Sequence, residues 1–322
     1  MSLSLTAGEG RAATGARPRP TRVRWDDLVA LRPHQVALNL GLSAPWLAGS
    51  LWAAQQDLYW LAMPLSAAFF LTALRQAHDS YHASIGVPRR WLDAVLLLLT
   101  LGMLCSTHAI RHTHLAHHRD PLGDGDEEGG WARQPAWRAL LLGPLFSLRT
   151  HAQALRMGSA RTRSWVWGEL LLIASVWLIA IAAEQAWLRY HVVAMMGSNA
   201  LVGFFAVWSV HHGCDAKGVF ARTERRTWVN RLTVNLLYHV EHHLYPAVPA
   251  NHLPVLASRL DAADPQWTQI RVLGGNQRLA GAPRRDHCAA ANAVPRPKVK
   301  STKPHNRYLP ASSAACRRTQ TL

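Results

Sequence analysis

The chain has 322 residues and a formal net charge of +16, from 35 lysines and arginines against 19 acidic residues. The basic residues lie in both ends and in the loops between apolar segments, without the zinc-finger or aromatic-and-basic pattern of a nucleic-acid-binding protein. We therefore expect no nucleic acid partner and, in its place, a membrane surface with anionic lipids.

The two ends of the chain differ in composition from its middle. Residues 1–33 are rich in Arg, Gly, Ala and Pro, and residues 274–322 are rich in Pro, Ser, Ala, Arg and Lys. Both contain few large apolar residues, a composition typical of disordered basic tails. The sequence therefore predicts one folded domain over residues 34–273.

Four segments of this domain provide about 20 apolar residues each, which is the length that crosses a bilayer. They form two hairpins, whose connecting loops at 55–57 and 184–189 carry only Arg189, whereas the longer loops and both ends are rich in arginine. By the positive-inside rule, the termini and the long loops lie on the cytoplasmic side of the inner membrane, if the source is bacterial. The predicted spans are residues 36–54, 58–77, 166–183 and 190–210.

Two further apolar runs are too short to span a bilayer. Residues 94–105 and 139–148 provide 12 and 10 residues, and at about 1.5 Å per residue neither crosses a core of about 30 Å. We expect them to dip into the membrane or to lie at its surface. The predicted fold is thus an all-α integral membrane protein with four transmembrane helices in two hairpins, plus interfacial or re-entrant helices.

Three histidine clusters, "HDSYH", "HLAHH" and "HVEHH", follow this pattern of apolar segments. Residues three and four apart share one face of a helix, so each cluster directs its imidazoles the same way. With the predicted topology, all three clusters meet at the cytoplasmic border of the membrane. Their members are His78, His82, His114, His117, His118, His239, His242 and His243.

Eight imidazoles exceed the coordination of a single metal ion and suit two. Imidazole binds iron, zinc, copper and nickel, so the ligand type alone does not select the metal. Iron is favoured by the setting, because a redox-active pair of ions can activate O2 for attack on an unactivated C–H bond at a membrane surface. The sequence therefore predicts a pair of irons at this site.

Other residues extend the predicted site. Of the two histidines in "VHHGCD", we choose His212 over His211 as a ninth ligand. Three carboxylates beside these histidines are predicted to accept the second ring N–H of a ligand, namely Asp79, Asp215 and Glu241. The acidic run "GDGDEEGG" at 123–130 lacks the order of a calcium-binding loop, and we interpret it as a flexible loop.

The motifs HxxxH, HxxHH and a later HxxHH resemble those of the membrane fatty acid desaturase superfamily, which also contains hydroxylases and carotenoid ketolases. The resemblance covers about residues 36–262 and implies that the eight box histidines hold two non-haem irons. His212 matches the extra histidine often found after the last membrane helix. The stretch "HVEHHLYPAVPANHLPVL" is most similar to bacterial acyl-lipid or acyl-CoA desaturases. The first box has Ser80 and Tyr81 where "HDxGH" carries its glycine.

The resemblance implies an O2-dependent desaturation of a fatty acyl chain in lipid metabolism. O2 would receive two electrons from the substrate and two from a separate donor, a ferredoxin or a cytochrome-like protein. Ketolation or hydroxylation of a carotenoid or other lipid uses the same site and stays open as an alternative. A membrane protein that binds or transports metal without catalysis is the alternative of another class.

Overall fold

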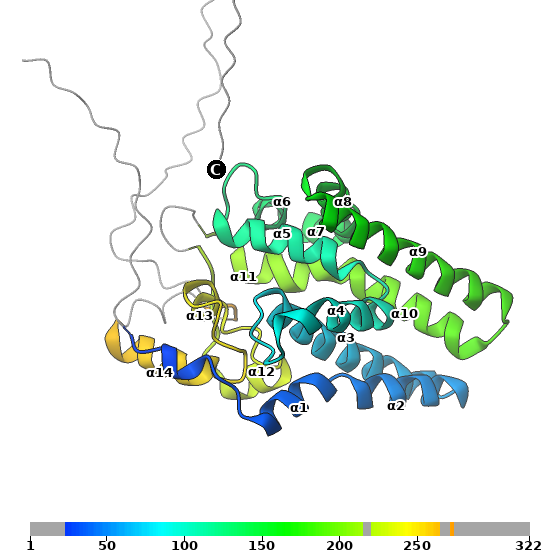
Figure 1. Cartoon of the computed structure of the whole chain (residues 1–322), viewed down its shortest axis with the longest axis horizontal. Helices are drawn as coiled ribbons and strands as arrows, with labels where there is room; N and C mark the ends of the chain where they lie inside the picture. Colours follow the sequence, from blue (N-terminus) through cyan, green and yellow to red (C-terminus); the bar gives the residue numbers. More distant parts are fainter. Residues whose placement is uncertain (1–22, 215–219, 265–270, 274–322) are drawn as a thin grey trace, which may run out of the picture. The chain divides into compact units, whose positions relative to one another are not determined.

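The computed structural model describes residues 23–214, 220–264 and 271–273. All regular structure in these residues is helical, and the only sheet-like feature is an isolated bridge between Thr223 and Arg271 (Figure 1). The predicted C-terminal tail and most of the predicted N-terminal tail lie outside the described residues. The folded part begins before the predicted boundary at residue 34, because Leu28 is buried against α14 (Leu253–Ala263).

The first hairpin pairs α2 (Ala44–Gln55) with α3 (Tyr59–Tyr81). The predicted span 36–54 is not one helix, since α1 (Pro33–Gly41) ends just before α2 begins. Pro45 lies in the first turn of α2, where a missing backbone N–H costs no helical hydrogen bond. The Ser50 and Ser66 hydroxyls join α2 to α3 at 2.6 Å.

The run 94–105 belongs to a bent pair of helices, α4 (Arg89–Met103) and α5 (Thr107–Arg119), whose axes differ by 112°. Leu104 adopts left-handed backbone angles at the bend. The fully buried Glu169 of α9 holds the bend, accepting hydrogen bonds from the Ser106 hydroxyl at 2.5 Å and the Thr100 hydroxyl at 2.7 Å. The chain therefore changes direction sharply between α4 and α5.

Four elements follow α5 and lead to the second hairpin. They are α6 (Glu127–Gly130), the 3-10 helix η2 (Trp131–Arg133), α7 (Ala136–Leu141) and α8 (Gly143–Met157). The predicted apolar run 139–148 is therefore divided between α7 and α8, and Pro144 lies in the first turn of α8.

The second hairpin consists of α9 (Ala160–Ala182) and α10 (Ala186–Val202), and it runs in the same direction as the α2–α3 hairpin (Figure 1). A π-helical segment, η3 (Gly203–Trp208), continues α10 into α11 (Ser209–His211). Within the described residues, α9 and the continuous segment Ala186–His211 are long and apolar enough to cross a membrane, and the bent α4–α5 pair raises the number to three.

The described C-terminal part packs α12 (Thr227–Leu232), α13 (His239–Leu244) and α14 against the start of the chain. Pro246 and Pro249 follow α13 and prevent its continuation. Arg225 fixes α13 to α14, since its guanidinium contacts Glu241 at 2.6 Å and Asp261 at 2.7 Å.

Candidate metal centre

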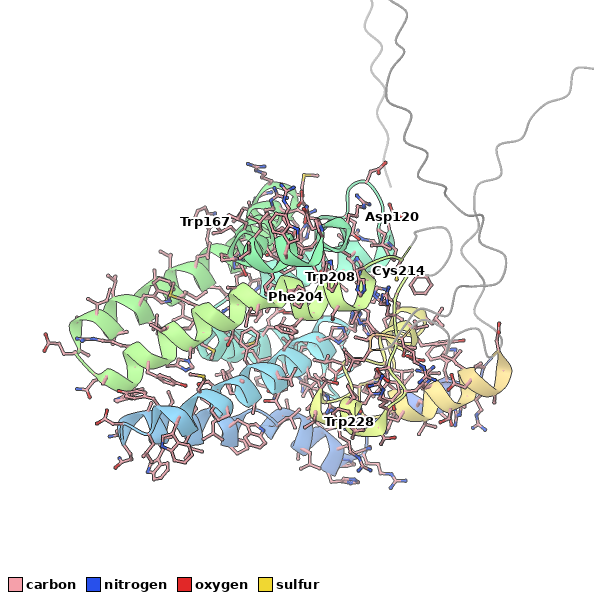
Figure 2. The ribbon with its side chains drawn as sticks, turned by 180° about the vertical axis from the view of Figure 1, so that it is seen from behind. Asp120, Trp167, Phe204, Trp208, Cys214 and Trp228 are labelled. Atoms are coloured by element: carbon pink, nitrogen blue, oxygen red, sulfur yellow. The ribbon has the colours of Figure 1, made fainter. Side chains whose placement is uncertain are left out.

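Four elements bring histidines to one place, namely the C-terminal end of α3, the second half of α5, the end of α11 and all of α13. Phe204 and Trp208, labelled in Figure 2, mark the segment that leads into α11. The eight histidines of the three predicted clusters all lie there, together with His211.

These nine histidines form two adjacent groups. The ligand nitrogens of the first group lie within 4.8 Å of one another, as do those of His117, His211 and His243 in the second. His239 joins the second group, because its Nε2 lies 2.9 Å from that of His211 and 3.1 Å from that of His243. The rings of His118 and His243 stack at 4.2 Å where the groups meet. The first group comprises His78, His82, His114, His118 and His242.

The spacing of the ring nitrogens fits ions held between them. Pairs of Nε2 atoms lie 2.9 to 3.1 Å apart, including His82 with His114 and His118 with His242. Two nitrogens about 2.1 Å from a common ion and at right angles to each other are separated by about 3.0 Å. The side chains are therefore spaced as neighbouring ligands are.

The hydrogen bonds at Nδ1 of His117 and His211 are compatible with a cation between the two rings. The Nδ1–H of His117 donates to Asp126 at 2.6 Å, and the Nδ1–H of His211 donates to the Phe220 carbonyl at 2.7 Å. In the neutral form each ring then has only a lone pair at Nε2, yet these two atoms face each other at 3.1 Å. A metal ion that accepts both lone pairs removes the conflict.

The environment of the α13 histidines keeps them neutral, the form that binds metal. Burial and neighbouring imidazoles hold the pKa of His239, His242 and His243 well below the usual value. Both ring nitrogens of His78 are buried without a hydrogen-bond partner among the described residues. Orphaned buried nitrogens are costly, and coordination of a metal ion by one of them would offset part of that cost.

The structure places one predicted ligand outside the two groups. His212 was chosen over His211, but only His211 faces the other histidines. His212 stacks on Trp208 at 3.9 Å, and its Nδ1 bonds to the Trp208 carbonyl, outside both groups. The π-helical segment η3 supplies the physical reason, since its wider turn rotates the residues that follow it relative to a regular α-helix.

Two of the three predicted carboxylate partners contact residues other than the clustered histidines. Asp79 lies 3.8 Å from Arg75 and accepts from the Ala250 amide, and Glu241 binds Arg225 and the Thr223 hydroxyl. Asp215 lies outside the described residues. Asp79 and Glu241 therefore hold their helices in place and do not receive a ring N–H.

The acidic run at 123–130 supplies the carboxylates instead. Asp126 accepts from His117 Nδ1, and Glu128 lies 3.0 Å from His114 Nδ1. Both acids are buried, and the Asp126 side chain also caps α6 by accepting from the Gly129 amide. The prediction of a flexible loop was wrong here. The capping pattern of an acid before "EEGG" was the available signal.

Comparison with known proteins gives a consistent result. Residues 58–271 match the family described as "Fatty acid desaturase". The human protein named sphingolipid delta(4)-desaturase/C4-monooxygenase DES2 is 29% identical over 266 residues, covering 74% of either chain. A Sorghum bicolor protein named probable fatty acid desaturase DES1 is 26% identical over 250 residues, covering 63% of this chain and 60% of its own.

Proposed function

The chain belongs to the fatty acid desaturase family, and on this premise we propose that it is a membrane-bound, O2-dependent desaturase that introduces a double bond into an acyl chain. Family membership makes it an oxidoreductase of lipid metabolism at a membrane. Two points go beyond family membership and are proposed: the acyl substrate, which is a lipid or a coenzyme A thioester, and the pair of irons.

One observation carries the proposal: nine histidines converge in two groups, and the Nε2 atoms of His117 and His211 face each other across 3.1 Å. The first group would hold one iron, and the second group with His239 would hold the other. Bound there, the two irons would supply the redox chemistry that reduces O2 and oxidises an unactivated C–H bond.

The chain's own residues position and protect this centre. Asp126 and Glu128 fix the ring orientation and tautomer of His117 and His114, which leaves Nε2 of each as the ligand atom. The Arg225–Glu241 ion pair holds α13 against the other helices. His117 is fully buried, and such burial excludes water from a reactive site.

The balance of the reaction requires a partner. Desaturation removes two hydrogen atoms from neighbouring carbons, and these provide half of the electrons that convert O2 to two waters. The other two electrons and two protons come from outside the substrate. We propose a separate ferredoxin or cytochrome-like donor, which suits the excess of basic residues in the long loops.

We also propose four membrane crossings, the first shared by the consecutive helices α1 and α2, with both termini and the metal centre on the cytoplasmic side. The support is that the α2–α3 and α9–α10 hairpins run in the same direction and that their tips carry only Arg189 as a basic residue. The metal centre lies at the opposite ends of these hairpins.

A monooxygenase is the second candidate, because the human relative is named as both a desaturase and a C4-monooxygenase. Hydroxylation and desaturation share the first hydrogen abstraction and differ in whether oxygen or a second hydrogen is transferred next.

Mass spectrometry of total lipids from a bacterial host distinguishes these outcomes. The host expresses the wild type, His242→Ala or, as a matched control, His34→Ala, whose exposed histidine lies on α1. We expect wild type and control to produce an acyl chain lighter by one hydrogen molecule, and His242→Ala to produce none. A product heavier by one oxygen atom establishes the monooxygenase. Identical lipids in all three strains, with iron bound by the purified wild type and an electron donor co-expressed, would favour a protein that binds metal without catalysis.

A further inference from the structure

A short segment beyond α14, residues 271–273, docks on the part of the chain between α11 and α12, and we call it the docked segment. The Val272 amide donates to the Thr223 carbonyl at 3.0 Å, and the Leu273 amide donates to the Glu224 carboxylate at 3.2 Å. Both contacts use main-chain amides, so they depend on the path of the chain and not on the side chains of the docked segment.

Two arginines hold the docked segment from the other direction. Arg222 Nη1 donates to the Arg271 carbonyl at 3.1 Å, and Arg226 Nη2 donates to the Leu273 carbonyl at 2.6 Å. Residues 222–224 are all buried. A buried polar group that loses a hydrogen-bond partner costs free energy, so the docked segment and residues 222–224 hold each other in place.

Residues 222–224 in turn reach the end of α11. The Arg222 amide donates to the Val210 carbonyl at 2.7 Å, and the Arg222 Nε donates to the His212 carbonyl at 2.7 Å. These two carbonyls flank His211, the ninth histidine of the centre. One buried arginine therefore bonds both to the docked segment and to the two neighbours of a candidate ligand.

The same residues also reach α13. The Thr223 hydroxyl donates to the Glu241 carboxylate at 2.7 Å, and the Glu224 amide donates to the carbonyl of Leu237, just before α13 begins, at 2.9 Å. Glu241 lies on α13 among the histidines of the third cluster. Residues 222–224 thus connect α11 to α13, and these two helices supply three of the four histidines of the second group.

We propose that the docked segment is a positioning element of the second metal site. By holding residues 222–224, it fixes α11 relative to α13 and so sets the geometry in which the second group presents its ring nitrogens. The proposal rests on the proposed function, because this is the site proposed to hold the second iron. It adds a requirement that lies outside the histidine clusters, namely that the second site depends on the chain as far as residue 273.

A proline in the docked segment tests the coupling. Val272→Pro removes one amide donor, and Val272→Ala, which keeps that amide, is the matched control. Amide hydrogen exchange of the metal-free full chain in detergent measures the coupling without iron or turnover. We expect the amides of Arg222 and Glu224 to exchange about threefold to tenfold faster in Val272→Pro than in the control, because their hydrogen bonds to Val210 and Leu237 loosen. Equal exchange in the two variants overturns the proposal.

Iron retention tests the step from the docked segment to the metal site. Each full chain is loaded with iron and titrated with a competing chelator, and the unfolding temperature of the metal-free protein is measured beside it. We expect wild type and Val272→Ala to retain two irons. Val272→Pro should release one of them about tenfold more readily, with the other iron and the unfolding temperature unchanged.

The two measurements separate the possible failures. A lower unfolding temperature in Val272→Pro, with both irons retained as in the wild type, assigns the docked segment to folding and overturns the proposal. A wild type that binds no iron refutes the proposed function, whereas hydrogen exchange still tests the docked segment.

The route through residues 222–224 is tested by combining two changes. Arg222→Gln removes the guanidinium that bonds to the carbonyls of Arg271 and His212. Because both changes act on residues 222–224, we expect Arg222→Gln/Val272→Pro to lose less iron affinity at the second site than the product of the two single effects. A loss equal to that product shows that the changes act independently and overturns the shared route.

Discussion

At the scale of single residues, the sequence predicted which eight histidines come together. It did not predict the ninth histidine or the carboxylates that fix the ring orientations. The spacing in "HLAHH" and "HVEHH" fixes the face of each helix, so the eight box histidines were predictable from local geometry. His211 was not, because its orientation depends on the π-helical turns before it. Asp126 and Glu128 were missed because their partners lie at least nine residues away and only the fold of α6 brings them close.

The carboxylate partner of His117 is expected to tune metal binding. Asp126→Asn keeps the shape of the side chain but removes the charge that fixes the ring and raises its basicity, so iron affinity should fall about 10- to 100-fold. The measurement is iron bound per protein against a competing chelator. The exposed neighbour in Glu127→Gln is the control and should bind iron as the wild type does.

Substitutions at His211 and His212 test which of the two histidines binds metal. We expect His211→Ala to lose most of the iron of the second group, because its Nε2 contacts both His117 and His239. His212→Ala should retain iron, since that ring stacks on Trp208 outside the groups. Elemental analysis of both purified variants checks this. Iron loss in His212→Ala alone would support His212, the ninth ligand predicted from the sequence.

At the scale of elements, the pattern of apolar segments predicted the helices better than their ends. The segments 166–183 and 190–210 correspond to α9 and to the continuous segment from α10 to α11. The division of 36–54 follows from Pro45, a local signal that an average over apolar residues conceals. The bend between α4 and α5 depends on Glu169, which lies more than 60 residues further along the chain. The residues around the bend therefore do not predict it.

The contact between α8 and α10 depends on a glycine. A Cβ atom at Gly143 would collide with the Ala200 carbonyl, and because that oxygen is backbone, the two helices would have to separate. Gly143→Ala is expected to cost about 1–3 kcal/mol and to lower the unfolding temperature in detergent. Gly197→Ala on α10 meets no atom within 4 Å and should leave that temperature unchanged or raise it. Equal effects of both changes would contradict the packing argument.

At the scale of the whole molecule, the predicted hairpins place two short loops away from the metal centre. Single cysteines at Gln56 and Gln185, in a chain without its native cysteines, should react in intact bacterial cells with a membrane-impermeant maleimide. A cysteine at Asp124 should react only after lysis. All three sites are exposed. Labelling of Asp124→Cys in intact cells would invert the proposed orientation.

The neutral imidazoles of the centre predict how the metal-free protein responds to acid. The pKa values of His239, His242 and His243 are lowered on folding, so below the unfolded value of about 6.5 the unfolded chain binds more protons. Stability is thus fully present above that pH and is lost as the pH falls through it.

The check is the unfolding temperature of chelator-treated protein at about pH 7.5, 6.5 and 5.5, values that bracket the histidine pKa. Replacement of the three α13 histidines by glutamine should make the profile less steep, because glutamine takes up no proton. A wild-type profile as flat as that of the variant would show that these imidazoles do not control the acid response.

The positions of the histidines along the chain determine when the metal centre can form during synthesis. His78 emerges from the ribosome more than 150 residues before His239, and both hairpins are complete before α13 is translated. Neither group is whole until α13 has docked beneath membrane helices that are already inserted. Under the proposed function, iron capture is therefore a late step in biogenesis, and a nascent chain that stalls before residue 239 reaches the membrane without a site that can retain the metal.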